Sequence, residues 1–492
     1  MRELNLISLL DAYRRLEPVL FDSYLNYHSI NLKRSELNDI SKLVSEVKKI
    51  NSKMVIFDKY FIGYKIPQIG KEFDLLRIDR DIVLNIEVKQ KSTVDKIQKQ
   101  LERNKYYLSF LNKEIQCFTY ISDENKLYVI NNNNQLVQTN IRQLLSVIAS
   151  QNVEKTTDID SYFNPSNYLV SPFNSTNEFI KGRYFLTTHQ ENIKNEILEK
   201  INSPSTSILS IKGKAGTGKT LLIYDIAKEI LKEEDVLVIH CGHLNDGHNI
   251  LIQDFNWDII SAKHIFIQDF STYKLVVLDE AQRVYPNFFD HVIKEVKKNN
   301  SNCILSHDER QTLSKSEINY KIPTKIESKI TYPTFELTNK IRTNKEVATF
   351  IDCIFNKDKL YTKQRNNSID ITFLENIDET IEFITQLKNQ GWKIINYTPD
   401  GYRTIPYERF RIMEESINSH TVIGQEFDNV VAIIDEHFYY ENNQLSTRGY
   451  SKAPYYHPTK MLYQIISRTR LKLHLIIFRN PIILSRCLEM LE

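Results

Sequence analysis

The chain has 492 residues, a formal net charge of +2 and 41% hydrophobic residues. A chain of this length is expected to form two or three domains of roughly 100–200 residues each, and its composition is that of a folded protein with packed cores. The near-neutral charge neither requires nor excludes a nucleic-acid partner, because local patches matter more than the sum. The five cysteines are scattered and form no CxxC pair, which argues against a zinc site or an iron–sulfur cluster.

Membrane insertion and secretion are not indicated. No run of about 18 apolar residues occurs that could cross a membrane. Residues 1–20 carry Arg, Glu and Asp where a signal peptide would have an apolar core. We therefore expect a cytoplasmic protein without a membrane partner.

The N-terminal third is predicted to begin with helices and to continue with short strands. In residues 35–50, Leu, Ile and Val recur at helical spacing. Later segments are short apolar or alternating runs typical of strands, interrupted by one helical segment and one turn. The predicted strands are 61–66, 73–79, 82–90, 117–122 and 126–131, the helix is 93–111, and the turn is 131–134.

The rest of the chain is predicted to alternate between strands and helices. A polar stretch over residues 151–183 indicates a linker, with a domain boundary near residue 175. Apolar runs then alternate with helical segments, which predicts a parallel sheet with helices on both faces. A second α/β block begins near Tyr332. The expected regions are 1–175, 176–330 and 331–492.

The strongest functional signal is the segment 213–220, GKAGTGKT, which matches the phosphate-loop pattern G-x-x-x-x-G-K-[ST] at every fixed position. An apolar strand precedes it and an amphipathic helix follows, so its backbone N–H groups can surround phosphates at a helix N-terminus. Lys219 is expected to bridge the β- and γ-phosphates, and Thr220 to bind Mg²⁺. The predicted nucleotide-binding residues of this loop are Gly213, Gly216, Gly218, Lys219 and Thr220.

A second signal is the run LVVLDEAQ, an apolar strand that ends in Asp279 and Glu280. Asp279 is expected to help hold the Mg²⁺ of the nucleotide, and Glu280 to orient the attacking water. Two acids at a strand end can also be merely solvated, but the phosphate loop upstream favours the catalytic interpretation. ATP with Mg²⁺ is thus the expected cofactor.

The DEAQ sequence at 279–282 is similar to the second motif of superfamily 1 helicases, and residues 183–480 resemble the RecD- and Schlafen-type branch of that family. Further motifs follow in the family's order, and the resemblance implies a role for each. Gln190 would contact the adenine. Gln311, in SHDERQ, would sense the γ-phosphate; in that motif His307 replaces the usual Gly.

The resemblance extends into the second α/β block. Arg342, in LTNKIRTN, and Arg468, in YQIISRTR, would act as arginine fingers, because negative charge develops on the phosphate oxygens in the transition state. Glu426, in HTVIGQEFD, would border the nucleotide cleft, and Thr421 would bond a backbone phosphate. The resemblance implies two RecA-like motor domains. Their short length leaves no room for large inserted subdomains, which favours translocation over processive unwinding.

Residues 70–91 carry a second candidate site. Asp74 falls in one predicted strand, and Glu87 and Lys89 fall in the next, after a turn at Asp79–Asp81. Residues i and i+2 of a strand share a face, so Glu87 and Lys89 project together, and a hairpin brings Asp74 beside them. The two carboxylates are expected to hold Mg²⁺ or Mn²⁺. Lys89 is expected to orient a water and to stabilise the developing phosphorane charge.

This pattern resembles the core of PD-(D/E)XK nucleases, most closely the nuclease-related branch. The matching positions are Gly70, Asp74, Glu87 and Lys89. The resemblance also implies a carboxylate from the first helix as a metal ligand, for which Glu36 is slightly favoured over Glu46, and a polar residue at Gln100. The Pro that the family often has before its first Asp is absent. An alternating, solvated strand face is the competing interpretation.

Together these signals predict an α/β protein in which a restriction-endonuclease-like domain precedes two RecA-like parallel-sheet domains. The expected function is an ATP-dependent translocase or helicase coupled to a metal-dependent nuclease that cleaves DNA in bacterial defence against phage. An RNA-cleaving Schlafen-like enzyme, and a nucleotide-dependent DNA-binding switch with an inactive nuclease fold, stay open as alternatives. So do a homo-oligomer and a partner protein from a defence system.

Overall fold

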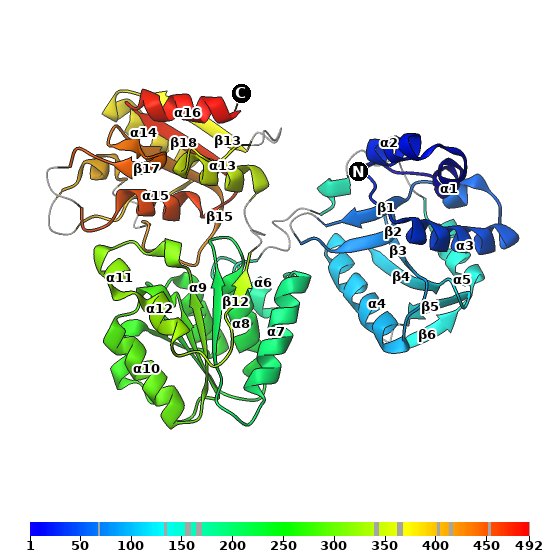
Figure 1. The fold of residues 1–492 in the computed structure, drawn as a ribbon, viewed down its shortest axis with the longest axis horizontal. Helices are drawn as coiled ribbons and strands as arrows, with labels where there is room; N and C mark the ends of the chain where they lie inside the picture. The colour runs from blue at the N-terminus through cyan, green and yellow to red at the C-terminus, as the bar shows by residue number, and fades with distance from the viewer. Residues whose placement is uncertain are drawn as a thin grey trace. The chain divides into compact units, whose positions relative to one another are not determined.

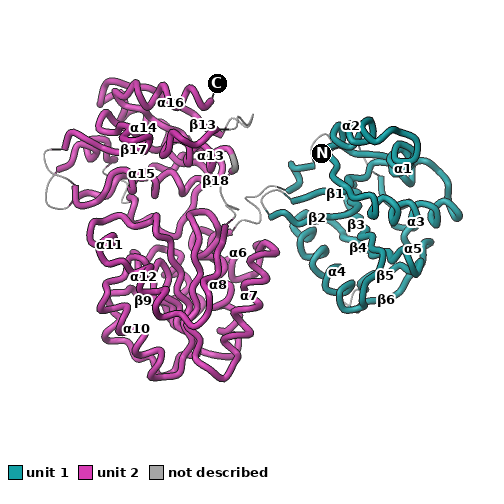
Figure 2. The backbone as a smooth tube through the Cα atoms, in the orientation of Figure 1, with its two compact units in different colours: residues 1–168 teal, residues 169–492 magenta. Residues whose placement is uncertain are grey.

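The structure, a computed structural model, describes residues 1–66, 69–131, 135–152, 159–163, 170–338, 344–361, 368–400, 404–412, 417–450 and 454–491. The chain divides into two compact units, Met1–Tyr168 and Leu169–Glu492 (Figure 2). The boundary expected near residue 175 stays a prediction, and residues 170–175 belong to unit 2. Among the described residues, none of the helices combines the length and apolar character that a membrane crossing needs.

Unit 1 is built on one mixed sheet with the strand order β1-β2-β3-β4-β5-β6 (Figure 1). β1, β2 and β3 are antiparallel neighbours, whereas β3 and β4 run parallel and are joined through helix α4. The helices are α1 (Leu6–Arg15), α2 (Pro18–His28), α3 (Arg34–Ile50), α4 (Val94–Leu108) and α5 (Ile141–Ser150). The strands are β1 (Phe61–Lys65), β2 (Glu72–Ile78), β3 (Ile82–Lys89), β4 (Glu114–Ile121), β5 (Lys126–Ile130) and β6 (Leu136–Thr139).

The two faces of this sheet differ in chemistry because side chains alternate along each strand. Leu84, Ile86 and Val88 of β3 face a hydrophobic core that α1, α2, α3 and α5 also build. Asn85 and Glu87, between them in sequence, face α4 instead. The sequence predicted β1 to β5 and α4, but it missed β6 and α5. The predicted turn at 131–134 lies mostly outside the described residues.

The first half of unit 2 is a parallel sheet with the order β12-β7-β11-β10-β8-β9. Its strands are β7 (Ile208–Gly213), β8 (Val236–His240), β9 (Asp258–Ser261), β10 (Leu275–Asp279), β11 (Asn302–His307) and β12 (Phe335–Leu337). Its helical segments are α6 (Thr176–Ile180), α7 (Thr188–Ile201), α8 (Lys219–Ile230), α9 (Asp246–Phe255), η5 (Ala262–Ile267), η6 (Ala281–Arg283), α10 (Pro286–Lys298), η7 (Glu309–Gln311), α11 (Lys315–Tyr320) and α12 (Ile322–Glu327).

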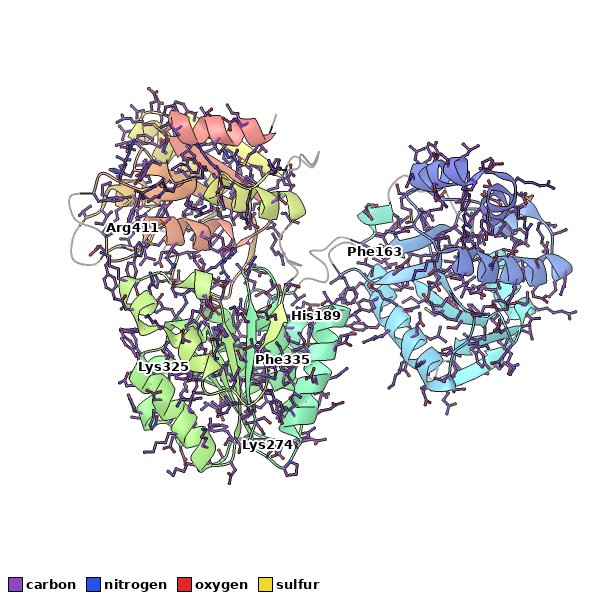
Figure 3. All side chains as sticks on the ribbon, viewed as in Figure 1. Phe163, His189, Lys274, Lys325, Phe335 and Arg411 are labelled. Atoms are coloured by element: carbon purple, nitrogen blue, oxygen red, sulfur yellow. The ribbon has the colours of Figure 1, made fainter. Side chains whose placement is uncertain are left out.

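The expected division at residue 330 stays a prediction, but the first sheet includes a strand that follows this residue. β12 lies beyond it, yet it pairs in parallel with β7 of the first sheet, with Phe335 opposite Ile211. His189, near the start of α7, adds a second link, because its Nε2 lies 2.9 Å from the backbone oxygen of Glu336. Figure 3 labels His189 and Phe335 on these two elements. The short strand was not predicted because three residues carry too little pattern.

The second half of unit 2 has a parallel sheet in the order β13-β18-β15-β14 and a separate hairpin of β16 and β17. Its strands are β13 (Ile369–Leu374), β14 (Lys393–Ile394), β15 (Phe427–Ile434), β16 (Phe438–Glu441), β17 (Gln444–Thr447) and β18 (Thr469–Phe478). Its helical segments are α13 (Lys345–Phe355), α14 (Ile377–Asn389), η8 (Pro406–Phe410), α15 (Pro458–Ile466) and α16 (Pro481–Leu491). The predicted α/β class is confirmed for the chain.

Phe173 and Asn174 contact residues from both halves of unit 2. The Phe173 ring is buried, with its centroid 4.0 Å from that of His248. A Cβ atom on Gly424 would lie 2.6 Å from this ring, and one on Gly247 would overlap the Phe173 backbone. Asn174 Oδ1 accepts a hydrogen bond from the backbone of Glu426 at 3.4 Å. Gly424 therefore leaves room for the Phe173 ring, and Gly247 leaves room for the Phe173 backbone.

Candidate functional site

The phosphate-loop segment lies between the end of β7 and the start of α8, as the sequence predicted. Gly216 and Gly218 have φ angles of +74° and +82°, a region that glycine enters without steric cost. A Cβ atom on Gly213 would lie 2.6 Å from Thr217 Oγ1. Lys219 is 6% exposed, and its Nζ donates to the backbone oxygen of Gly213 at 2.6 Å. The loop thus curls around its own lysine at the N-terminus of a buried helix.

Asp279 ends strand β10, which is separated from β7 by β11, and is fully buried. Its Oδ1 accepts hydrogen bonds from Ser306 Oγ at 2.6 Å and from the Glu280 backbone at 3.0 Å. Its Oδ2 lies 3.3 Å from His240 Nδ1. Thr220 is buried at the start of α8, which packs against β10. The two residues expected to hold a nucleotide-bound cation therefore stand on adjacent elements.

Glu280 follows with a left-handed φ of 57°, a backbone conformation that costs free energy for a residue other than glycine and is often found at functional sites. Its carboxylate accepts from Gln282 Nε2 at 2.8 Å and from Arg283 Nε at 3.4 Å. Burial by itself would raise the pKa of Glu280, but the positive charges of Arg283, Lys219 and Arg468 outweigh it and lower the pKa to about 2. Glu280 is therefore ionised at neutral pH.

A chain of contacts joins the second half of unit 2 to the phosphate loop. Arg468, directly before β18, donates from NH2 to Gln311 Oε1 at 2.8 Å. Gln311 in turn donates from Nε2 to Asp308 Oδ2 at 2.9 Å. The same Asp308 oxygen lies 3.9 Å from Lys219 Nζ. One predicted arginine finger and the predicted γ-phosphate sensor are thus brought together next to the loop.

The replacement of the usual Gly by His307 does not disturb this chain. His307 ends β11, and its Nε2 lies 3.0 Å from Ser210 Oγ on β7. Asp308, which follows, has an ordinary φ of −142°. Burial lowers the pKa of His307 to about 4, so the ring is neutral at neutral pH. The turn therefore needs no glycine, because an extended backbone carries the chain into η7.

The other predicted residues of this site have mixed outcomes. Gln190 is buried and bonds to its own helix start and to the phosphate loop, accepting from the Thr187 backbone at 2.9 Å and donating to the Thr217 backbone oxygen at 3.1 Å. Its contact with adenine stays a prediction. Glu426 is 8% exposed and lies close enough to Arg468 for their charges to interact. Arg342 lies outside the described residues.

In unit 1 the structure brings Asp74, Glu87 and Lys89 together. The register that pairs Leu75 with Ile86 places Asp74 of β2 across from Glu87 of β3. Lys89 Nζ lies 2.9 Å from Asp74 Oδ2 and 3.4 Å from Glu87 Oε2. Both carboxylates therefore lie on the α4 face of the sheet and share one ammonium group.

Glu87 is held in a buried polar network that the sequence interpretation found only in part. Its carboxylate accepts from Asn104 Nδ2 on α4 at 2.8 Å, from Asn85 on the same strand at 3.4 Å, and from Gln100, as the resemblance implied. Asn85 interrupts the apolar run IVLNIEVK, and that interruption was the signal for the missed partners. Burial, together with the charge of Asp74, raises the pKa of Glu87.

The expected helix carboxylate does not join this cluster. Glu36 lies in the first turn of α3, where its Oε2 accepts from the Lys33 backbone at 2.9 Å. Glu46 pairs with Lys49 at 2.5 Å. Over the described ranges, no group of three or more His, Cys, Asp or Glu side chains is placed to hold a metal ion. Glu36 instead serves as a helix cap, a role that residues at this position often have.

Comparison with known proteins finds a family match for one part of the chain. Residues 206–395 match the family model for the Schlafen group 3, DNA/RNA helicase domain. No curated protein matches the chain. Among solved structures, a chain from a study of forked double-stranded DNA unwinding by two coordinating Pif1 helicases is 13% identical, with 59% of this chain and 92% of that chain covered and a TM-score of 0.34.

Two further solved structures are similar over shorter parts. A putative primosome component from Streptococcus pyogenes serotype M3 is 14% identical, with 31% of this chain and 80% of that chain covered and a TM-score of 0.21. Domain III of the Thermotoga maritima replication initiation protein DnaA is 13% identical, with 36% and 72% covered and a TM-score of 0.23. From the family match, residues 206–395 form a helicase-like ATPase domain.

Proposed function

We propose that this protein is an ATP-driven translocase on nucleic acid whose unit 1 is a metal-dependent nuclease that cleaves DNA. The observation that carries the motor part is the contact chain from Arg468 through Gln311 to Asp308, which ends beside Lys219. A γ-phosphate placed at Lys219 would lie next to groups from both halves of unit 2. ATP binding and hydrolysis would then change how the two halves are held, which is what stepping along a strand requires.

Each residue of the motor site has a chemical task in this proposal. Lys219 supplies positive charge to the β- and γ-phosphates, and Thr220 and Asp279 hold the Mg²⁺ that accompanies the nucleotide. Glu280, ionised by its positive neighbours, accepts a hydrogen bond from the attacking water. Arg468 lies where negative charge develops on the phosphate oxygens. Arg342 and Glu426 are proposed to complete the cleft.

The nuclease part rests on the chemistry of the Asp74–Glu87 pair. Two carboxylates on one face of adjacent strands offer oxygen ligands, and Mg²⁺ in proteins is commonly held by one or two carboxylates while it keeps several waters. A divalent cation would also favour ionised Glu87, which its burial disfavours. The residues present therefore fit Mg²⁺ or Mn²⁺, which would supply an activated water. Lys89 would stabilise the charge that develops on the scissile phosphate.

DNA is the proposed substrate and phage DNA the proposed target, since a motor that moves along a strand can present it to an attached nuclease. The family description names both DNA and RNA, so an RNA substrate stays the second candidate.

The test uses the full chain with labelled single- and double-stranded DNA and RNA, with and without ATP, and with Mg²⁺, Mn²⁺ or Ca²⁺. We expect Mg²⁺- or Mn²⁺-dependent cleavage of DNA, which Asp74→Ala, Glu87→Ala and Lys89→Ala each remove while ATP hydrolysis stays. Glu46→Ala is the matched control, because Glu46 is a unit 1 glutamate outside the cluster. Cleavage of RNA alone would show that the substrate is RNA rather than DNA. Cleavage of neither, with ATP hydrolysis intact, would leave a nucleotide-dependent switch.

A further inference from the structure

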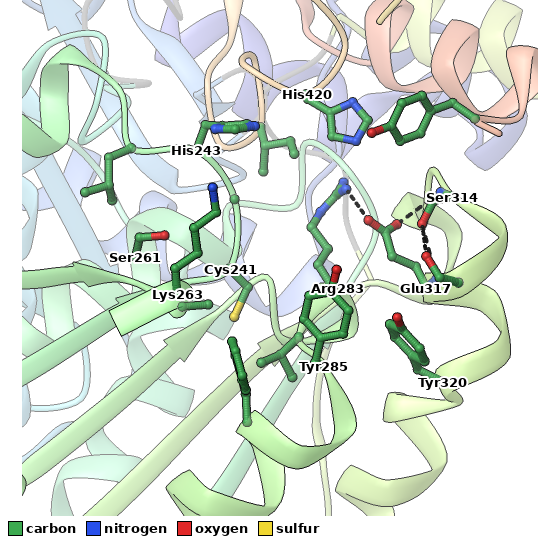
Figure 4. A pocket seen from close by; sticks show the side chains of 18 of the residues that line it. Cys241, His243, Ser261, Lys263, Arg283, Tyr285, Ser314, Glu317, Tyr320 and His420 are labelled. Atoms are coloured by element: carbon green, nitrogen blue, oxygen red, sulfur yellow. Dashed lines mark hydrogen bonds and ion pairs between the residues drawn. The ribbon is translucent and has the colours of Figure 1, made fainter. Parts of the chain in front are cut away.

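A pocket of about 560 Å³ lies in unit 2, and none of its described lining residues belongs to the phosphate loop. Its walls come from the loop that follows β8, from η5, from the end of η6, from α11 and from the segment around His420 (Figure 4). Residues from both halves of unit 2 thus line one cavity. Tyr285 and Tyr455, which are 54% and 39% exposed, are among them.

The pocket is positively charged and contains aromatic side chains. Lys263 and Arg283 extend into it from different elements (Figure 4), and Glu317 is the one acidic residue among its described lining residues. Burial lowers the pKa of His420 to about 3, with the positive charge of Arg283 as a further cause. Burial and the charge of Lys263 likewise lower the pKa of His243. Burial, the larger cause at both histidines, disfavours either sign of charge, whereas the positive charges of Arg283 and Lys263, the smaller causes, would attract an anion.

Arg283 is a buried charged group of this pocket whose two terminal nitrogens, NH1 and NH2, lack hydrogen-bond partners within the described part of the chain. Its side chain is only 3% exposed. Its nearest acidic contacts are long: 3.4 Å from Nε to Glu280 Oε2 and 3.6 Å from NH1 to Glu317 Oε1. Well-formed guanidinium–carboxylate hydrogen bonds measure about 2.7–2.9 Å. Two terminal nitrogens therefore stay available in a buried site.

We propose that a phosphodiester group of a single-stranded nucleic acid binds in this pocket, and that Arg283 is a positioning residue that reports its presence to Glu280. The inference rests on the proposed motor function. It adds a physical link between the bound nucleic-acid strand and the Glu280 carboxylate, which orients the attacking water. Arg283 stands between the two, because it lines the pocket and contacts Glu280.

The physical basis is that Glu280 and a bound phosphate would compete for the guanidinium group of Arg283. Without a strand, Glu280 Oε2 is shared by Gln282 and Arg283, so one of its oxygens is occupied twice. A phosphate can accept two parallel N–H bonds from an arginine, a stronger arrangement than either of the present long contacts. When Arg283 turns to the phosphate, Glu280 keeps Gln282 and gains the capacity to bond a water. Bases can stack on Tyr285 and Tyr455 without sequence preference.

The experiment measures ATP hydrolysis by the full chain at increasing concentrations of oligo(dT) and oligo(rU), for wild type and Arg283→Gln. Wild type should be slow without a strand and strongly stimulated by at least one of the two probes. Arg283→Gln should be faster than wild type without a strand and should have a stimulation ratio near one. Arg183→Gln is the matched control, an exposed arginine outside both sites.

Two further variants separate binding from coupling and guard against a folding defect. Lys263→Gln should raise the strand concentration for half-maximal stimulation and lower the salt dependence of binding by about one phosphate contact, while the maximal stimulation stays. Arg283→Lys should keep strand binding but show reduced stimulation, because an ammonium group lacks the paired N–H geometry. Melting curves should show that each variant is folded.

The outcomes are distinguishable. No stimulation of wild type by either probe would defeat the proposed motor function itself. Normal stimulation of wild type and of Arg283→Gln alike would leave the motor function standing and overturn the role of Arg283. Loss of all hydrolysis in folded Arg283→Gln would show that Arg283 supports Glu280 rather than restraining it, which also overturns the inference.

Discussion

Two buried glutamates, Glu87 in unit 1 and Glu280 in unit 2, lie beside positive side chains, and their pKa values are shifted in opposite directions. Glu87 in unit 1 is 1% exposed, and burial raises its pKa. Glu280 in unit 2 is 3% exposed, and its pKa is lowered to about 2 although burial opposes this. Similar burial therefore does not decide the direction of the pKa shift.

The neighbours decide it. Glu87 has a second carboxylate, Asp74, directly across the strand pair. The charge of Asp74 adds to burial in raising the pKa of Glu87, and the positive charges of Lys89 and Lys71 do not offset the two together. Glu280 has four neighbours whose charges lower its pKa, namely Arg283, Lys219, Arg468 and His240, and no carboxylate is among the principal causes of its shift. The first environment suits a bound cation, and the second suits the polyanionic phosphates of a nucleotide. A buried glutamate thus suits a cation site in unit 1 and a nucleotide site in unit 2.

The largest expected effect is at the nucleotide site of unit 2, where positive side chains surround Glu280. Lys219→Ala should abolish ATP hydrolysis, because the β- and γ-phosphates lose the ammonium group that the loop holds in place. Metal-dependent cleavage of a short oligonucleotide by unit 1, measured without ATP, should be unchanged. Wild-type hydrolysis in this variant would contradict the assignment of the motor site.

The second effect concerns the contact chain between the two halves of unit 2. Arg468→Ala should lower kcat by about 10³–10⁵, the range that arginine fingers contribute in related nucleotide hydrolases, and should change ATP affinity much less. Arg342→Ala should behave similarly. Steady-state kinetics with saturating oligonucleotide measure both constants. If the affinity falls and kcat stays, Arg468 binds the ground state and is not a finger.

The third effect concerns Phe173, whose buried ring packs between residues from the two halves of unit 2. Phe173→Ala should reduce the stability of unit 2 by about 3–5 kcal/mol, the usual cost of removing a buried phenylalanine ring. Denaturant unfolding of the full chain, followed by probes in each unit, should show the change in unit 2 only. Phe266→Ala is the control, because that ring is 52% exposed. Equal losses in the two variants would mean that Phe173 is not packed as described.

The sequence predicted the elements that carry strong local patterns. The phosphate-loop strand and helix, and β2 and β3 with their alternating faces, follow from a few residues each, because a period of two or a glycine-rich turn is readable without the fold. The strand–helix alternation was also sufficient for the α/β class, which the structure confirms.

The sequence could not predict features that depend on tertiary partners. Arg283 follows DEAQ and looks like a surface residue, yet it is buried against Glu280 and Glu317. Phe173 lies in a polar stretch that indicated a linker, and its burial depends on glycines distant in sequence. Glu36 has the right residue type and helix for a metal ligand, but its carboxylate caps α3. Residue type and spacing do not specify such contacts.

The smallest expected effect is on thermal stability. It tests the Asp74–Glu87 pair of unit 1 without measuring catalysis. A carboxyl whose pKa is raised by folding stabilises the folded state fully below the unfolded pKa, and loses that stabilisation as pH rises through the folded pKa. At neutral pH the burial of Glu87 therefore opposes folding. Glu87→Gln should melt at a higher temperature than wild type at pH 7 in the presence of a chelator, and the difference should shrink as pH falls toward the unfolded pKa.

Added Mg²⁺ should reverse this order, because a bound cation stabilises wild type through two carboxylates and the variant through one. The measurement is a pair of melting curves for each protein, with chelator and with Mg²⁺, over a range of pH. Glu46→Gln is the control, since its side chain pairs with Lys49 away from the cluster. If the chelator-treated variant melts lower than wild type, the hydrogen bonds from Gln100 and Asn104 outweigh the burial of charge at Glu87. The contrast with Glu280 would then lie in hydrogen bonding rather than in the sign of the neighbouring charges.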